Sequence, residues 1–415
     1  MLPTSTLAAQ ISRALMAEGG ALPSAFPRTI GPNAKKYLAE VVDSGLTVDM
    51  VGRFERAFAE ALGVKYCVST PGCTAALHVL ALACDFKPGD EVIVSPVTDF
   101  GTVQGMLAQH VIPIFPDTAP GSINFSAETI APHINDRTRA ILCVHKTGII
   151  CDMDPINELA KKHNLFVFED CCQAVFGRYK GRLAGTLGHA ACFSFDPEKS
   201  MGSDTGGCMV TNDPELHERA RFMGQNRAGV MRPHFGRTHT AVGFPYRMPQ
   251  CTAAICLAQL GIVRDQIARR DEMARLLYKH LAEIPGITPL HVPDYVDVYS
   301  CWMAGFNIDP AAFTCSAEEF GATLADAGIP GAGTAQYYLL TEALTFLRDQ
   351  SENRRYPFTS PPASRVPTYG AATSPNAAQF LSTFIRWSTF CEKYTPEHCE
   401  LAANIVRQTA DKYRA

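Results

Sequence analysis

A lysine among small and acidic residues follows one apolar segment of this chain. In CFSFDPEKSMGSDTGG (192–207), Lys199 comes shortly after the apolar residues 192–195. A lysine that is partly removed from water, near cationic or aromatic groups, releases its proton readily, and the free amine can attack an aldehyde. A solvated loop lysine is the commoner explanation for any single residue of this kind, so Lys199 needs support from other segments.

Two carboxylates end a second apolar segment, FEDCCQAV (168–175). A buried acid such as Asp170 needs a positive partner, because burying an unpaired charge is costly. The pyridine nitrogen of pyridoxal 5'-phosphate (PLP) supplies one, since the ring is an electron sink only when that nitrogen is protonated and an adjacent aspartate holds the proton there. The alternative for Asp170 is a helix N-cap.

Small residues form a third candidate segment, TPGCTAALH (70–78), between an apolar run and a helix-like stretch. They let the backbone approach a ligand, and the N–H groups of the first helical turn point toward it, which is a geometry that binds phosphate. The hydroxyl of Thr74 can add a donor. A Pro-Gly pair before a helix is also an ordinary turn, so this segment is ambiguous on its own.

The three segments belong to an alternation of apolar runs and helix-like stretches over residues 52–225. We predict strands at 66–70, 91–96, 112–117, 140–145, 165–170 and 192–195, with helices at 73–84 and 153–164 among them. Such alternation predicts βαβ crossovers and a mainly parallel sheet covered on both faces. Ligands of such sheets lie beyond the carboxyl ends of the strands, where the three segments begin.

The pattern changes near residue 250. The stretch 250–284 has no proline and predicts a long helix, kinked at Gly261. A strand at 299–308, a helix at 316–327, a segment rich in Pro, Ser and Thr (357–375) and a final helix at 396–413 follow. We therefore expect an N-terminal arm (1–25), a large PLP-binding α/β domain (26–262) and a smaller α+β domain (263–415).

Composition limits the partners and the compartment. The 415 residues are 47% hydrophobic and 19% charged with a net charge of −4, which is typical of a globular protein and indicates neither a nucleic-acid nor a membrane partner. The N-terminus reads as an amphipathic arm and not as a signal peptide, so we expect a cytoplasmic protein. Most of the fifteen cysteines lie in apolar runs without zinc-site spacing, so we predict structural thiols and no metal.

Together, these segments resemble the DegT-type sugar aminotransferases, a branch of the fold-type I PLP enzymes. The resemblance covers about residues 42–275. It rests on SGLTVDMVGRFERAFAEALGVKYCVST (44–70), KPGDEVIVSP (87–96), VHKTGIICDMD (144–154), LAKKHNLFVFEDCCQAVFGRYKGRLAGTLGHAACFSFDPEK (159–199) and GFPYRMPQCTAAICLAQL (243–260). It implies a mainly parallel seven-stranded sheet with a smaller C-terminal domain, the cofactor PLP, and a homodimer that shares its active sites.

The resemblance also assigns roles to single residues. Lys199 corresponds to the lysine that binds PLP as a Schiff base and moves protons, and Asp170 to the partner of the pyridine nitrogen. Gln173 corresponds to the residue beside the ring hydroxyl, and Phe100 to an aromatic ring stacked on the pyridine. Gly72, Cys73, Thr74 and Ser194 would hold the phosphate. His145 matches a histidine near the site, although a histidine satisfied within the core explains it equally well.

The chain departs from the family pattern at two places. Residues 203–207 (SDTGG) replace a run that usually ends in Gly-Glu-Gly-Gly. Pro245 replaces a frequent asparagine that reaches the neighbouring subunit's phosphate, and proline has neither a backbone N–H nor an amide. That contact is lost or comes from elsewhere, such as NRAG (226–229). AGIPGAGTAQYY (327–338) is similar to the branch that acts on keto-cyclitols or unusual sugars.

The leading functional prediction is transfer of an amino group from glutamate or glutamine to a ketone on a sugar or cyclitol. PLP also supports dehydration, elimination and aldol-type steps, which are the first alternative. In the dehydratase relatives a histidine replaces the lysine, so the lysine at 199 favours transfer. A ligand sensor without catalytic activity is the second alternative, because a fold alone never excludes it.

Overall fold

The computed structural model describes residues 21–225, 230–232, 236–238, 241–334, 337–359 and 363–415. Most of the predicted N-terminal arm, and the NRAG segment at 226–229, lie outside these residues. No helix in the described part of the chain is long and apolar enough to cross a membrane.

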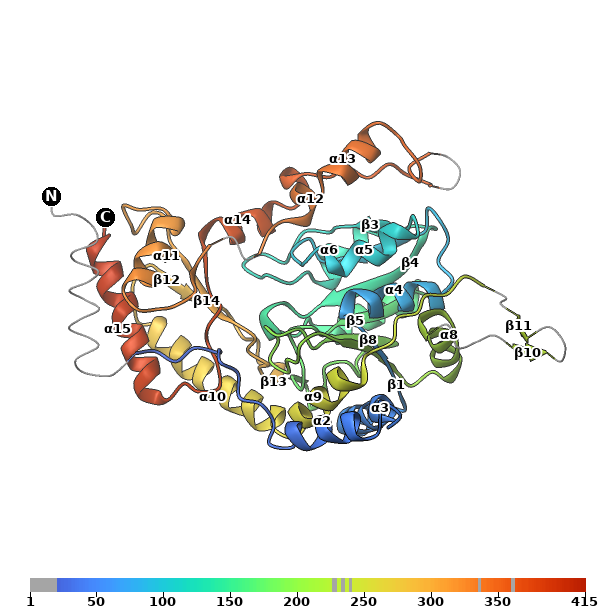
Figure 1. Ribbon diagram of the computed structural model, residues 1–415. Helices are drawn as coiled ribbons and strands as arrows, with labels where there is room; N and C mark the ends of the chain where they lie inside the picture. Colours follow the sequence, from blue (N-terminus) through green and yellow to red (C-terminus); the bar gives the residue numbers. More distant parts are fainter. Residues whose placement is uncertain (1–20, 226–229, 233–235, 239–240, 335–336, 360–362) are drawn as a thin grey trace.

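A seven-stranded sheet forms the centre of the large domain (Figure 1), and the predicted α/β class is confirmed. Its spatial order is β1-β9-β8-β5-β4-β2-β3, and only β9 runs antiparallel to its neighbours. The six predicted strands are present within a few residues, and β9 is the seventh. The strands are β1 Tyr66–Thr70, β2 Glu91–Val94, β3 Ile112–Ile114, β4 Thr138–Val144, β5 Phe166–Asp170, β8 Ala190–Ser194 and β9 Gly207–Thr211.

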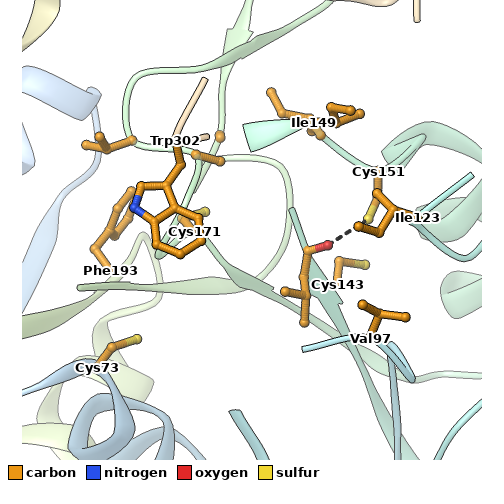
Figure 2. Packing of buried hydrophobic residues seen from close by; sticks show 14 of the residues in the cluster. Cys73, Val97, Ile123, Cys143, Ile149, Cys151, Cys171, Phe193 and Trp302 are labelled. Atoms are coloured by element: carbon orange, nitrogen blue, oxygen red, sulfur yellow. Dashed lines mark hydrogen bonds between the residues drawn. The ribbon is translucent and has the colours of Figure 1, made fainter. Parts of the chain in front are cut away.

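The strands are mostly apolar because helices cover both faces of the sheet, and their polar residues lie mainly at the strand ends. Val92 and Ile93 of β2 and Ile141 of β4 are completely buried. Each such side chain stabilises the fold by about 1.5–3 kcal/mol relative to an exposed one. Figure 2 shows part of this core, including the hydrogen bond that the Cys151 thiol donates to the carbonyl oxygen of Val144 at 3.4 Å.

The helices of the large domain fill the connections between strands. Phe54 and Phe58 of α3 pack edge-on against Phe195, while α4 contacts both α5 and α8. The predicted helices at 73–84 and 153–164 are confirmed as α4 and α7. The helices are α2 Ala34–Asp43, α3 Met50–Leu62, α4 Cys73–Ala83, α5 Gly101–Ala108, α6 Ala127–Ile130, α7 Met153–Lys162, α8 Pro214–Gln225 and α9 Gln250–Leu260.

The predicted long helix is divided at Gly261 into α9 and α10 (Val263–Leu281). The N–H groups of Gly261 and Ile262 bond to carbonyls three residues earlier, and the φ of Ile262 is −125°. The tightened turn ends one helix and redirects the next, so the break lies where the sequence predicted a kink. It also falls at the predicted domain boundary, although the exact limits of the domains stay a prediction.

A smaller C-terminal domain follows α10 (left in Figure 1), built on a four-stranded antiparallel sheet ordered β12-β14-β16-β15. The predicted strand at 299–308 is wrong in its first half, because only residues 304–308 join this sheet. Helices predicted at 316–327 and 396–413 are confirmed. The elements are β12 Ile287–Pro289, β14 Ala304–Ile308, α11 Ala317–Asp326, β15 Ala332–Gly333, α14 Pro375–Thr383, β16 Phe384–Trp387 and α15 Pro396–Lys412.

A segment from the C-terminal part returns to the large domain. The Arg365 guanidinium pairs with the carboxylate of Glu91, and the Tyr369 hydroxyl donates to the carbonyl of Pro113 at 2.9 Å. Figure 1 shows α12 and α13 of this segment on the side of β3 and α5. The remaining short elements are β6 Arg178–Tyr179, β7 Arg182–Leu183, β10 Val230–Arg232, β11 Gly236–Thr238, β13 Val296–Val298, α12 Leu340–Ala343 and α13 Thr345–Glu352, with 3-10 turns at Ala131–His133, Lys146–Gly148 and Ala371–Thr373.

Candidate active site

A cavity of about 410 Å³ lies beyond the carboxyl ends of the parallel strands. Its floor comes from the residues that follow β1, β2, β4, β5 and β8, as expected for a sheet of this kind. The C-terminal part of the chain closes it with three aromatic side chains, Trp302, Tyr337 and Tyr338. The described lining residues are Gly72, Cys73, Thr74, Leu77, Thr98, Asp99, Gly101, Thr102, Val144, Lys146, Asp170, Cys172, Gln173, Ser194, Asp196, Glu198, Lys199, Trp302, Tyr337 and Tyr338.

Helix α4 begins at one end of this cavity. Its N-cap is Gly72, which has no side chain to bond the first N–H groups of the helix. These N–H groups and the helix dipole therefore favour an anion at this end. The hydroxyls of Thr74 and Ser194 also line the cavity, and Cys73 lies between the N-cap and Thr74. The structure thus brings together all four residues predicted to hold a phosphate.

Two glycines permit the close packing around this helix end. A Cβ on Gly101, the first residue of α5, would lie 2.6 Å from the Thr74 hydroxyl oxygen. A Cβ on Gly207 would lie 2.4 Å from the backbone nitrogen of Cys73. Side chains at these positions would push α4 or the Thr74 hydroxyl away, so glycine keeps both in place.

Asp170, the last residue of β5, turns its carboxylate to the cavity and is 4% exposed. One oxygen accepts a hydrogen bond from the Thr102 hydroxyl at 2.9 Å, and the other accepts from the backbone N–H of Cys172 at 3.1 Å. These two bonds fix the carboxylate but leave lone pairs available. The carboxylate of Asp170 is thus a fixed acceptor that lines the cavity, and the residues that follow it form turns and not a helix that it could cap.

Gln173 is held by its side-chain oxygen. Oε1 accepts from the backbone N–H of Thr147 at 2.7 Å and from the Tyr337 hydroxyl at 2.9 Å. Because the oxygen has both donors, the amide nitrogen Nε2 is the part of the group that remains to donate toward a ligand.

Lys199 lies on the loop after β8, where its backbone N–H bonds to the carbonyl of Asp196 at 2.9 Å. Its Nζ is 4.4 Å from the centre of the Trp302 ring. The Trp302 indole in turn donates to the Glu198 carbonyl at 2.8 Å, which joins the lysine loop to the C-terminal domain. The aromatic neighbour expected for a reactive lysine is thus present.

Residues 203–207, where the chain departs from the family pattern, are held by hydrogen bonds to two neighbouring segments. The Thr205 hydroxyl donates to the carbonyl of Pro71 at 2.8 Å, and the Thr252 hydroxyl of α9 donates to the Asp204 carboxylate at 3.2 Å. Gly206 has a φ of +117°, in the region that favours glycine. The unusual sequence at 203–207 therefore still forms an ordered wall beside the α4 N-terminus.

Phe100 is not among the described residues that line the cavity. It precedes the first turn of α5, and its half-buried ring packs at 6.1 Å from the ring of Phe346 in α13. Its neighbours Asp99 and Gly101 line the cavity instead. The aromatic side chains that reach the cavity come from the C-terminal part instead. Tyr337 and Tyr338 end the segment AGIPGAGTAQYY (327–338), to which the sequence assigned no aromatic role, and Trp302 lies outside the segments of the resemblance.

Lys146 is a site residue that the sequence reasoning missed. It lies two residues after the end of β4, its side chain is buried, and its Nζ is 3.9 Å from the centre of the Tyr337 ring. Burial lowers the pKa of Lys146 to about 7, with Asp170 acting to raise it and Lys199 to lower it. The signal that could have found it is its place after a strand, in the matched segment VHKTG (144–148).

His145 is satisfied within the core. Its Nε2 lies 3.0 Å from the Glu169 carboxylate, and its Nδ1 accepts the backbone N–H of Cys151 at 3.3 Å. Glu169 also accepts three backbone N–H groups, from Gly185, Leu187 and Gly188. This buried network fixes the sheet behind the site.

All fifteen cysteines are free thiols, and eleven of them are buried. Burial raises the pKa of the Cys73 thiol well above its usual value, and a hydrogen bond with Cys73 together with burial raises that of Cys172. Neither thiol is a thiolate nucleophile near neutral pH.

The residues of the cavity fit PLP group by group. The uncapped N-terminus of α4 with two hydroxyls suits a phosphate, the fixed Asp170 carboxylate suits a protonated pyridine, and the Lys199 amine suits an aldehyde. The cavity volume also lies within the usual range for small-molecule sites.

Comparisons with known proteins agree with this fit. The model of the DegT/DnrJ/EryC1/StrS aminotransferase family matches residues 28–371. A GDP-perosamine synthase of Caulobacter vibrioides is 38% identical over 273 residues, which are 65% of this chain and 72% of that protein. The crystal structure of 3-amino-5-hydroxybenzoic acid synthase superposes with a TM-score of 0.80 at 25% identity, covering 94% of this chain and all of the other. DesV of S. venezuelae gives a TM-score of 0.76 at 26% identity, covering 91% and 94% of the two chains. This chain therefore belongs to the DegT/DnrJ/EryC1/StrS aminotransferase family and is a PLP-dependent aminotransferase.

Proposed function

We propose that this enzyme transfers an amino group from glutamate or glutamine to a ketone on a sugar or a cyclitol. The observation that carries the proposal is the convergence of Lys199, Asp170 and the uncapped N-terminus of α4 on one cavity. Each of these groups meets a different part of the cofactor, so the same residues explain cofactor binding and reactivity.

In this proposal, the backbone N–H groups at Gly72 and Cys73 and the hydroxyls of Thr74 and Ser194 bind the cofactor's phosphate. Asp170 keeps the proton on the pyridine nitrogen, and Gln173 donates from Nε2 to the ring hydroxyl. Bound PLP supplies an electron sink for the carbon that carries the amino group. The bonds from Thr102 and the Cys172 N–H orient Asp170 before any ligand binds, which lowers the cost of reorganisation.

Lys199 has two roles in this scheme. It holds the cofactor covalently through Nζ, and when released it moves a proton between carbon atoms of substrate and cofactor as a general base and acid. Trp302 limits where Nζ can move, because the indole is tied to the Glu198 carbonyl and lies against the lysine. A positioned lysine of this kind accelerates proton transfer by about 10²–10⁴-fold.

The polar part of the cavity supports a hydroxylated acceptor. Asp99, Asp196, Glu198 and Tyr338 line it and can accept hydrogen bonds from sugar or cyclitol hydroxyls, which would orient the carbonyl. The similarity to a GDP-perosamine synthase supports a sugar, and the similarity to 3-amino-5-hydroxybenzoic acid synthase supports a carbocycle.

An absorption spectrum of the purified enzyme with PLP tests the proposal. We expect the band of lysine-bound PLP to appear, to be lost in Lys199→Ala, and to convert to that of pyridoxamine phosphate when glutamate or glutamine is added without acceptor. A lysine-bound band that no amino donor converts would instead favour elimination or aldol-type chemistry. If no such band forms, the assignment of Lys199 is wrong.

We also propose that the enzyme is a homodimer in the cytoplasm. Exposed apolar side chains lie on and beside α2, at Phe26, Ile30, Val42 and Leu46, which supports a protein interface there. The free thiols support a reducing compartment. Light scattering should give twice the chain mass of 45.1 kDa, and a value of 45.1 kDa would contradict the dimer.

A further inference from the structure

The backbone around Lys146 is held in an unusual shape that directs its side chain into the cavity. Thr147 has a φ of 56°, a rare value for a β-branched residue, and Gly148 follows with a φ of 95°. A Cβ on Gly148 would lie 1.8 Å from the carbonyl oxygen of Ser300, so the turn is pressed against the segment that carries Trp302. The backbone N–H of Trp302 completes the contact by donating to the Thr147 carbonyl at 3.1 Å. Strain of this kind is typical of functional sites.

The amine of Lys146 has no polar partner among the described residues. The side chain is only 1% exposed, yet no hydrogen bond or ion pair to Nζ is formed within the described part of the chain. The contact of Nζ with the ring face of Tyr337, whose centre is 3.9 Å away, is its one cation–π contact among these residues. A cation–π contact provides up to about 2 kcal/mol, while burying an ammonium ion costs several kcal/mol. The contact with the ring therefore does not offset the burial.

Four titratable groups on three neighbouring segments act on Lys146. Asp99 follows β2, Asp170 ends β5, Cys172 lies just beyond it, and Lys199 lies on the loop after β8. Burial lowers the pKa of Lys146 to about 7, Asp170 opposes this shift, Lys199 adds to it, and Asp99 and Cys172 oppose it. Near neutral pH, the amine is thus able to gain or lose its proton according to what enters the cavity.

Lys146 and Lys199 are the only cationic side chains among the described residues that line the cavity. If Lys199 holds the cofactor, Lys146 is left to meet a negative group on a substrate. The nearby Arg386 guanidinium is already engaged by the carbonyl oxygens of Gly331 and Thr334. The other charged lining groups are carboxylates, which would repel an anion.

We propose that Lys146 binds a carboxylate group of a bound substrate, and that it thereby selects an anionic amino donor or an anionic acceptor. This inference rests on the proposed function, because it assumes that Lys199 is occupied by the cofactor. An amino acid donor brings a carboxylate to the site in every cycle, and an acidic carbocycle would do so as an acceptor. The carboxylate gives the buried amine a polar partner, which the described residues do not supply.

Equilibrium binding to the PLP-loaded enzyme tests the proposal without using catalysis. Isothermal titration calorimetry would measure two carboxylates that cannot be transaminated: glutarate, which resembles the donor, and quinate, which resembles a carbocyclic acceptor. The variants are Lys146→Met and Lys146→Arg, and Lys162→Met is the matched control on the exposed end of α7. We expect Lys146→Met to weaken at least one ligand by about 10- to 100-fold, with part of the affinity retained in Lys146→Arg and no change in the control.

The pattern of the losses identifies the source of the carboxylate. If Lys146→Met weakens only glutarate binding, the carboxylate belongs to the amino donor. If it weakens only quinate binding, the carboxylate belongs to the acceptor, and if it weakens both, donor and acceptor share the site. The proposal is overturned if the wild-type enzyme binds neither ligand or if Lys146→Met binds both as well as the wild type does. An enzyme that binds glutarate through Lys146 but shows no transamination would contradict the proposed function and leave the carboxylate site standing.

A second measurement needs no substitution. In the wild-type enzyme, a carboxylate binds only the protonated form of Lys146, so its affinity should be constant below about pH 7 and fall up to tenfold per pH unit above it. An affinity that does not change between pH 6 and pH 9 would overturn the proposal even if Lys146→Met failed to fold.

Discussion

Replacing Gly101 by alanine should weaken cofactor binding without unfolding the enzyme. The added Cβ would lie 2.6 Å from the Thr74 hydroxyl oxygen and 3.1 Å from a carboxylate oxygen of Asp99. The first distance is far below a normal contact, and the Thr74 side chain relieves it most easily by rotating its hydroxyl away. That rotation removes one donor from the proposed phosphate site.

The size of the effect follows from the bond that is lost. A hydrogen bond to a charged group is worth about 1.5–3 kcal/mol, which corresponds to roughly 10- to 150-fold in the dissociation constant. Stability should change little, because alanine is a better helix former than glycine by up to about 1 kcal/mol in a helix interior and offsets part of the strain. The backbone of Gly101 is not in the left-handed region, so alanine adds no conformational penalty.

The assay is titration of the cofactor-free enzyme with pyridoxamine phosphate, which has no aldehyde and cannot bond covalently to Lys199. Gly261→Ala is the control, since its Cβ would make only an ordinary contact of 3.4 Å with the carbonyl of Ala258. A Gly101→Ala variant that binds pyridoxamine phosphate as tightly as the wild type would refute the assignment of Thr74 to the phosphate. An equal loss in Gly261→Ala would show that the effect is not local.

Three other substitutions and one pH measurement test neighbouring parts of the site. Lys199→Ala should abolish conversion of the cofactor by amino donors while pyridoxamine phosphate still binds, and single-turnover absorbance would follow both. Asp170→Asn should lower the single-turnover rate by about 10²–10³-fold, because the amide cannot hold the pyridine proton; a rate within threefold of wild type would contradict that role. Tyr337→Phe removes the hydroxyl that donates to Gln173 at 2.9 Å and should lower the free energy of unfolding by about 1 kcal/mol, measured by urea denaturation. Glutarate binding at pH 8 should take up about one proton, because burial keeps the pKa of Lys146 near 7 until a carboxylate raises it. Calorimetry in two buffers of different ionisation enthalpy measures this uptake, and binding without proton uptake would contradict the prediction.

The floor of the site could be predicted from sequence because its parts are local. Asp170 and Lys199 each follow an apolar strand, and in a parallel sheet the carboxyl ends of neighbouring strands meet at one edge. The same rule applied to β4 would have found Lys146. The family resemblance assigns Lys146 no role, because the residue of this segment that matches a family site residue is its neighbour His145.

The roof of the site, which consists of the aromatic residues Trp302, Tyr337 and Tyr338 that close the cavity, could not be predicted in the same way. The residues 299–303 have the apolar character of a strand, and the sequence predicted one there. They leave the sheet because Ser300 is pressed against Gly148 and Trp302 bonds to Thr147, contacts between segments far apart in the chain. Tyr337 likewise gains its role only from the approach of Gln173 and Lys146. Apolar patterning carries no information about such long-range contacts.

This division between floor and roof has a consequence for substrate choice. In the proposed function, the floor residues Asp170, Gln173 and Lys199 contact the cofactor and not the acceptor, so they would not determine which acceptor binds. Trp302 and Tyr337 close the cavity from the C-terminal part, and they contact Lys199 and Lys146 directly. Lys146 joins the two sets, because its backbone belongs to the floor and its amine lies under an aromatic ring of the roof. A change at Lys146 should therefore alter which substrates bind while leaving PLP in place, whereas a change at Asp170 should affect the reaction of every substrate.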